Sequence, residues 1–187
     1  MASVQEAVKL EPTPTVIEGP YYRLNSPERN VLIDDPNDPG ERIILTGRVL
    51  STEGAPFANA IVDLWSSDGV VGDYDMVGYN YHGHTRTDSE GKYWFETVIA
   101  ACYEPRDAKH LHVKVQGTST RPLTTQLYFS NDERRVKDHY WKDILDIQVG
   151  DKGSDGKYHG TFDFVLKQVT EKENVTKESL ERRIPGI

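Results

Sequence analysis

The chain has 187 residues, a length that predicts one domain built around one hydrophobic core. Hydrophobic residues make up 36% of the chain and aromatic residues 10%, which excludes a disordered chain. The formal net charge of -8 argues against nucleic acid as a partner, because phosphates require a basic surface.

Cross-linking and targeting signals are few in this chain. Its one cysteine, Cys102, cannot form an intrachain disulfide. No apolar run approaches the length of a membrane span, and residues 1–6 lead into no signal-peptide core. We therefore expect a cytoplasmic protein that has no membrane partner.

The first 40 residues are rich in Pro, Asn and Asp and lack helical periodicity, so they predict an extended N-terminal arm. Two adjacent tyrosines in this arm, Tyr21 and Tyr22, need a surface to pack on. A core over residues 41–168 and a charged C-terminal tail over residues 169–187 complete the predicted organisation.

The core region alternates apolar and polar residues from Arg42 onward, the pattern of half-buried strands. Turn sequences at 52–56 and 88–91 separate the early strands, and a long glycine-rich loop is predicted over 66–87. The predicted strands are 42–49, 60–65, 92–98, 109–116, 123–129 and 159–166. Short strands at regular spacing predict an all-β fold, a two-sheet β-sandwich with long loops.

One or two short helices are expected to accompany the strands. Asn131, followed by Asp132 and Glu133, can cap a helix that runs toward Trp141. Thr170 and Glu173 have the spacing of a capping box, which predicts a second helix in the tail.

His110-Leu111-His112 is the first feature that indicates chemistry. On a strand both imidazoles leave the same face, with their backbones roughly 6.6 Å apart at about 3.3 Å per residue. Two neighbouring nitrogen ligands of one metal ion can be reached from that spacing, while Leu111 points into the core. A bare pair of this kind usually binds no metal, so the prediction depends on further ligands.

A second pair, His82-Gly83-His84, lies in the predicted loop. Strand alternation gives no reason for these imidazoles to converge there, so we assign them a loop role.

Tyrosines can complete a metal site beside the first histidine pair. Phenolate is a hard oxygen donor that suits ferric iron. Tyr103 lies seven residues before His110, and Tyr74, Tyr79 and Tyr81 lie in the long loop. Composition and spacing alone do not choose among these three.

The motifs, taken in order from about residue 13 to residue 166, resemble the intradiol ring-cleaving dioxygenases, the family of the catechol, hydroxyquinol and protocatechuate dioxygenases. The residues that carry the resemblance are EGPYY at 18–22, TGRV at 46–49, the segment 54–65, GDY at 72–74, TDSEGKYWF at 87–95, Tyr103, HLH at 110–112 and TQLYF at 125–129. The resemblance selects Tyr74 over Tyr79 and Tyr81. It indicates a compact member without the family's helical dimerisation region.

The resemblance implies a non-heme ferric ion, Fe(III), bound by Tyr74, Tyr103, His110 and His112. It implies that Tyr103 leaves the iron when the substrate arrives and then acts as the base. Gln126 and a positively charged side chain are expected to stabilise charge during the reaction.

The charged residue stays open at this point. The family usually has Arg-Pro-x-His before its histidine pair, whereas this chain has RDAKH at 106–110. Either Arg106, displaced by one position, or Lys109 supplies the positive charge. Lys109, Tyr21 and Tyr22 are the residues expected to contact the substrate.

The resemblance implies an enzyme that inserts both atoms of O2 into a catechol-type substrate. The ring opens between the two hydroxylated carbons and gives a muconate-type diacid. The oligomeric state stays open, since Tyr21, Tyr22 and the charged tail can pack on a partner subunit, which would give a homo-oligomer, or on the same chain. The alternative is a non-catalytic transthyretin-like or carboxypeptidase-regulatory-like module, which has no reason to keep Tyr103, His110 and Gln126 together.

Overall fold

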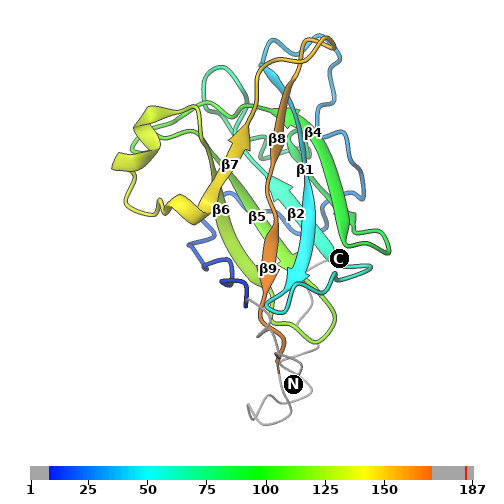
Figure 1. Ribbon diagram of the computed structural model, residues 1–187. Helices are drawn as coiled ribbons and strands as arrows, with labels where there is room; N and C mark the ends of the chain where they lie inside the picture. The colour runs from blue at the N-terminus through cyan, green and yellow to red at the C-terminus, as the bar shows by residue number, and fades with distance from the viewer. Residues whose placement is uncertain (1–8, 170–183, 185–187) are drawn as a thin grey trace, which may run out of the picture.

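The computed structural model describes residues 9–169 and 184, and its strands form two packed layers (Figure 1). In chain order the strands are β1 (Arg42–Ser51), β2 (Ile61–Trp65), β3 (His82–Arg86), β4 (Lys92–Val98), β5 (His110–Gln116), β6 (Leu123–Phe129), β7 (Asp146–Val149), β8 (Tyr158–Thr161) and β9 (Phe164–Leu166). One layer has the order β3-β2-β5-β6-β7, and the other continues from β7 through β8 and β1 to β4, with β9 beside β1. The predicted all-β sandwich is confirmed.

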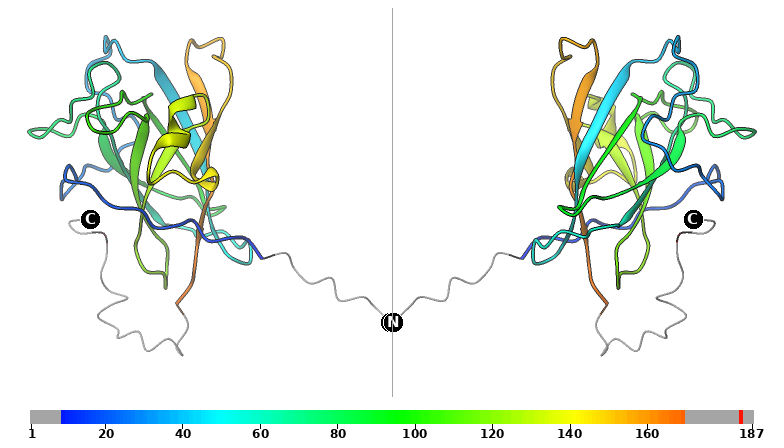
Figure 2. Two further views of the ribbon diagram at one scale, coloured as in Figure 1. Left: turned by 90° about the vertical axis from the view of Figure 1, so that its left-hand side faces the viewer. Right: turned by 90° about the vertical axis from the view of Figure 1, so that its right-hand side faces the viewer.

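The interior lies between the two layers, which Figure 2 shows from the side. Leu45 of β1 and Phe95 of β4 meet Leu111 and Val113 of β5 there, and none of these side chains is exposed. Alternation along β5 therefore directs His110 and His112 to the opposite face of their sheet, as strand geometry predicts. The core holds the sheet that carries the histidines.

β3 is a strand where a loop was predicted, and that prediction was wrong. Its sequence, HGHTR, has few strand-forming residues, so long-range pairing decides its structure. β3 pairs with β2 on one side, and on the other the arm exchanges backbone hydrogen bonds with His84 from Pro27 and Arg29. Gly83 permits this contact, because a Cβ there would lie 2.8 Å from a methyl carbon of Leu32.

The last predicted strand, 159–166, is divided into β8 and β9. Both pair in parallel with β1 in one register, and residues 162–163 between them belong to neither strand. A Cβ on Gly47 would lie 1.7 Å from the carbonyl oxygen of Phe162, so the glycine makes room for this close approach. β7 was not predicted, because four residues with the sequence DIQV carry too little alternation.

The predicted helix after Asn131 is a short 3-10 helix, η1 (Glu133–Lys137). The cap is Asp132, one residue after the predicted Asn131, and it accepts a hydrogen bond from the backbone of Arg134. A second 3-10 turn, η2 (Asp143–Leu145), follows. The helix predicted at Thr170 and nearly all of the predicted tail lie outside the described residues. In the described part of the chain, no helix has the length and apolarity that crossing a membrane requires.

The arm runs along β6 and at Gly19 lies against His112. Thr125 donates a side-chain hydrogen bond to the carbonyl of Pro14, and the backbone of Val16 donates to that of Thr124. His110 and His112 are each only 1% exposed although they face away from the core, because Tyr103 and Tyr128 pack around His110 and the arm covers His112. The outer face of this sheet is therefore an enclosed compartment.

Candidate metal centre

His110 and His112 present neutral imidazoles to this compartment. Nδ1 of His110 lies 2.8 Å from the carbonyl oxygen of Ala108, which can only accept, so Nδ1 donates and Nε2 keeps its lone pair. The two rings lie 4.9 Å apart between centroids. Burial lowers the pKa of His110 to about 4 and the pKa of His112 well below its ordinary value. Neutral imidazole is the form that binds metals.

Tyr74 and Tyr103 reach the same place from two different loops. The hydroxyl of Tyr103 lies 3.4 Å from Nε2 of His110, and the rings of Tyr74 and Tyr103 meet edge to face with centroids 5.4 Å apart. The Tyr74 ring lies 6.2 Å from that of His112. Gly72 allows the two loops to touch, because its φ is +87° and a Cβ there would lie 2.4 Å from the carbonyl oxygen of Cys102. The four predicted ligands are thus brought together.

The unsatisfied atoms of this cluster test whether it fits a metal ion. The hydroxyl of Tyr74 and both ring nitrogens of His112 are buried and have no hydrogen-bond partner among the described residues. A buried polar atom without a partner costs about 1–3 kcal/mol. A cation could bind the Tyr74 oxygen and one of the two His112 nitrogens, and a set of two phenolic oxygens and two imidazoles suits a hard ferric ion.

The tyrosines are essential to such a site. Within residues 9–169 and 184, no group of three or more His, Cys, Asp and Glu side chains is arranged to hold a metal. Burial raises the pKa of both Tyr74 and Tyr103, whereas the positive charge of Arg106 acts to lower both. Both tyrosines are therefore phenols at neutral pH until a cation favours their ionised form.

The arm closes over the cluster at Tyr21. The Tyr21 ring stacks on that of Tyr74 with centroids 4.1 Å apart and an interplanar angle of 17°, and it meets Tyr103 edge-on at 5.9 Å. Gly19 has a φ of +77°, and a Cβ on it would lie 3.1 Å from Cε1 of His112. Tyr21 is therefore in direct contact with the predicted ligands.

Tyr22 lies one layer further away. Its hydroxyl donates to a carboxylate oxygen of Asp63 at 3.0 Å, and its ring packs against Trp65 at 4.8 Å. Trp65 in turn stacks on His112 with centroids 5.1 Å apart. Tyr22 supports the site from behind and does not line it.

A buried polar cluster around Asp63 was not foreseen. Ser26 donates to Asp63 at 2.9 Å and lies 3.0 Å from Nδ1 of His84, and Nε2 of His82 lies 3.2 Å from Asp63. The loop role assigned to the two histidines was wrong, since both are buried on β3. A carboxylate inside the apolar strand IVDLW is the sequence signal that could have revealed the cluster.

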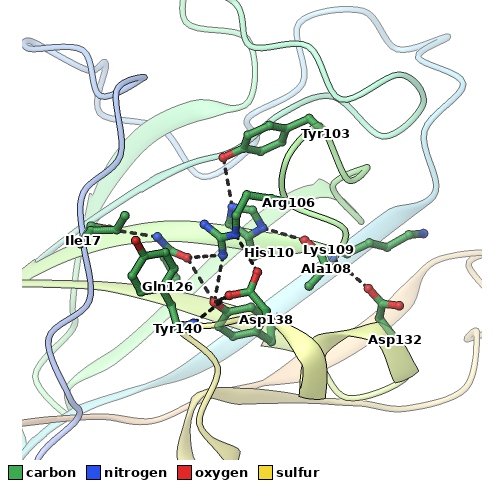
Figure 3. A network of polar contacts seen from close by, with 11 residues as sticks. Ile17, Tyr103, Arg106, Ala108, Lys109, His110, Gln126, Asp132, Asp138 and Tyr140 are labelled. Atoms are coloured by element: carbon green, nitrogen blue, oxygen red, sulfur yellow. Dashed lines mark hydrogen bonds and ion pairs between the residues drawn. The ribbon is translucent and has the colours of Figure 1, made fainter.

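Arg106 lies beside two of the predicted ligands, Tyr103 and His110, in a network of polar contacts (Figure 3). Its Nε donates to Asp138 at 2.6 Å, and its Nη2 donates to the side chains of Gln126 at 2.8 Å and Tyr128 at 3.1 Å. Gln126 stands opposite His112 in the β5–β6 pair and donates its amide N–H to the carbonyl of Ile17 at 3.0 Å.

Lys109 has different surroundings. Its backbone N–H donates to Asp132 at 2.8 Å, and its side chain points away from Arg106 in Figure 3. Of the two candidates for the positive charge, Arg106 is therefore the one that faces the predicted ligands.

Several known proteins are similar to this chain in sequence. Residues 17–168 match the family model described as Dioxygenase. Catechol 1,2-dioxygenase 2 of Acinetobacter lwoffii is 32% identical over 144 residues, which are 64% of this chain and 52% of that protein. Chlorocatechol 1,2-dioxygenase of Pseudomonas sp. strain P51 is 28% identical over 177 residues, 83% of this chain and 70% of that protein. The chain spans about half the length of the Acinetobacter catechol 1,2-dioxygenases that it matches.

Solved structures extend the similarity to the fold. The dioxygenase domain of a dioxygenase carbohydrate-binding protein fusion from Streptomyces sp. SirexAA-E superposes with a TM-score of 0.79 at 34% identity, over 85% of this chain and 100% of that one. The 3-chlorocatechol 1,2-dioxygenase of Rhodococcus opacus 1CP gives 0.77 at 25% identity, over 87% of this chain and 75% of that one. These similarities favour an enzyme over the alternative of a non-catalytic β-sandwich module.

Proposed function

The chain belongs to the intradiol ring-cleaving dioxygenase family, and on that premise we propose that it inserts both atoms of O2 into a catechol-type substrate. The ring opens between the two hydroxylated carbons and yields a muconate-type diacid. The observation that carries the proposal is the meeting of Tyr74, Tyr103, His110 and His112, with buried oxygen and nitrogen atoms that lack protein partners.

Tyr74, Tyr103, His110 and His112 are the residues that would hold a non-heme ferric ion. Such an ion supplies a Lewis acid for both catechol oxygens and makes the ring reactive toward dioxygen. The donor set supports this choice of metal, because phenolates stabilise the ferric state.

Tyr103 is the proposed base. Its hydroxyl lies 3.4 Å from Nε2 of His110, in the outer part of the cluster. A free tyrosine hydroxyl has a pKa of about 10, close to that of a catechol hydroxyl, so a phenolate at Tyr103 can take the substrate proton at its oxygen. Tyr74 keeps its place, since its hydroxyl is buried beneath the Tyr21 ring.

Arg106 and Gln126 are the proposed stabilisers of negative charge during ring opening. Arg106 is already oriented by its hydrogen bonds, so its charge needs no rearrangement at the moment of reaction. Gln126 holds Arg106 on one side and the arm on the other. The proposal gives no charge-stabilising role to Lys109, whose side chain points away.

Tyr21 is the proposed wall of the substrate pocket. It stacks on Tyr74 and can present its ring to a planar substrate, since aromatic rings pack favourably face to face with an offset or edge to face. Tyr22 contributes by fixing the arm through Asp63.

Oxygen uptake tests this function directly. The iron-loaded protein is supplied with catechol, hydroxyquinol, protocatechuate and substituted catechols, and the product is analysed after reaction under ¹⁸O2. We expect one O2 consumed per substrate and both labelled atoms in one diacid product. Absence of uptake with every catechol, in protein that carries iron, would contradict the proposal.

A further inference from the structure

Asp138 is the residue that ends η1, and it lies behind Arg106. Its side chain is only 4% exposed. One carboxylate oxygen accepts from Nε of Arg106 at 2.6 Å, and the other accepts from the hydroxyl of Tyr128 at 3.0 Å and the backbone N–H of Tyr140 at 2.9 Å. Two other segments, those of Arg106 and Tyr128, therefore converge on this one carboxylate, and its own turn supplies the third hydrogen bond.

A gain in folding stability does not explain well why Arg106 and Asp138 form a buried ion pair. Removing two charges from water costs about as much as their attraction returns, so a buried ion pair is weak evidence for stabilisation. The directional hydrogen bonds around Asp138 instead determine where the Arg106 guanidinium lies. Because the guanidinium is planar, fixing Nε and Nη2 also fixes Nη1.

The remaining edge of Arg106 is available to a ligand. Nε and Nη2 donate within the network, whereas Nη1 meets no acceptor in the described part of the chain. The ring of Tyr140 lies 5.1 Å from the guanidinium carbon, which restrains the group further. Arg106 is thus immobilised with one nitrogen unpaired.

A turn over residues 103–106 joins Arg106 to Tyr103, the proposed base. The backbone N–H of Tyr103 donates to the carbonyl of Arg106 at 3.0 Å, and the N–H of Arg106 donates to the carbonyl of Tyr103 at 2.5 Å. A displacement of Arg106 would therefore be transmitted to Tyr103. Asp138 therefore restrains Arg106 directly and restrains Tyr103 through the turn that contains both residues.

We propose that Asp138 is a positioning residue for catalysis, which orients Arg106 so that its unpaired Nη1 meets the negative charge that develops on the substrate. Tyr128 shares this role, because it donates to Asp138 and accepts from Arg106. The inference rests on the proposed dioxygenase function and assigns to it a residue outside the predicted set.

The test compares Asp138→Asn with Asp146→Asn in the iron-loaded enzyme. Asp146 is a matched control, because it is also a buried carboxylate that accepts from an arginine, Arg135 at 2.8 Å, and from Trp141 at 2.8 Å. With catechol as substrate, Asp138→Asn should lower kcat by about 10- to 100-fold and change KM by less than about threefold. Asp146→Asn should leave both within about twofold.

A double-mutant cycle shows whether Asp138 acts through Arg106. In an Arg106→Lys background, Asp138→Asn should lower kcat by less than about a further twofold, because the guanidinium that Asp138 orients is already absent. The inference would be overturned if the kcat losses of the two single variants multiplied in the double variant. It would also be overturned if Asp138→Asn had the same kinetics as Asp146→Asn.

Nuclear magnetic resonance of the metal-free protein gives a readout independent of turnover. The Arg106 Nε–H signal, identified by its loss in Arg106→Lys, should exchange slowly with water in the wild type and in Asp146→Asn, and rapidly in Asp138→Asn. Rapid exchange in the wild type overturns the positioning role alone. A wild type that turns over no catechol overturns the dioxygenase function and this inference with it.

Discussion

Two buried polar clusters flank Trp65, and they differ in how their polar atoms are satisfied. On one side Asp63 has Tyr22, Ser26 and His82 within 3.2 Å. On the other side the hydroxyl of Tyr74 and both nitrogens of His112 meet no partner in the described part of the chain. In the first cluster protein donors satisfy the Asp63 carboxylate, although Nε2 of His82 makes no hydrogen bond in the described part of the chain. In the second cluster the atoms without partners belong to the proposed metal ligands.

The largest difference between the clusters should appear in iron affinity. Replacing His112 by Gln removes a proposed ligand, and we expect the affinity for ferric iron to fall by more than about 100-fold, since loss of a group that is hydrogen-bonded to a metal ligand already costs about 10- to 100-fold. His82→Gln, on the other side of Trp65, should keep its iron. The iron content of each variant after competition with a chelator checks both expectations. Equal loss of iron in the two variants would contradict the distinction between the two clusters.

The pH dependence of stability should reflect the metal site. In the metal-free protein the pKa of His110 is lowered by burial from 6.5 to about 4, so below pH 6.5 the unfolded chain binds a proton that the folded chain does not. Stability is therefore lost as the pH falls from about 6.5 to about 4. At about 1.4 kcal/mol per pH unit, this interval corresponds to about 3 kcal/mol.

Urea unfolding at several pH values measures this loss. The decrease should be smaller in His110→Asn, which has no imidazole to protonate at this position. If wild type and variant lose the same free energy of unfolding between pH 7 and pH 4.5, the decrease has another origin.

Two tyrosine-to-phenylalanine changes give the smallest effects and compare the clusters most closely. Tyr22→Phe removes a donor from buried Asp63 and should lower the free energy of unfolding of the metal-free protein by about 1–3 kcal/mol. Tyr74→Phe removes a buried hydroxyl that has no partner, so it should be neutral within about 0.5 kcal/mol or stabilising. Denaturant unfolding of the two variants measures both changes in the free energy of unfolding. Equal losses would mean that the Tyr74 hydroxyl has a partner after all.

The elements that could be predicted from the sequence are those in which local pattern and burial agree. β5 alternates apolar and polar residues along its length, so both the strand and the shared face of His110 and His112 follow from it. β3 has no such pattern and exists because β2 and the arm pair with it on either side. Pairing partners distant in the chain leave no trace in the pattern of the strand itself.

The charge at the site shows the same limit. Arg106 and Lys109 are three residues apart, and the sequence does not say which one faces the predicted ligands. The answer depends on Asp138, which lies 32 residues beyond Arg106, at the end of η1. The roles of Tyr74 and Tyr103 rest on family resemblance, since spacing alone left other tyrosines open. Tyr79, one of these, donates its hydroxyl hydrogen bond to the carbonyl of Leu24.

The absorption spectrum of the iron-loaded protein tests the proposed ferric centre most directly. If Tyr74 and Tyr103 bind ferric iron, tyrosinate-to-iron charge transfer should colour the pure protein red-brown. Tyr74→Phe and Tyr103→Phe should each change that band, and Tyr79→Phe should leave it intact. A colourless iron-loaded protein, or a band unchanged in both Tyr74→Phe and Tyr103→Phe, would contradict the proposed centre.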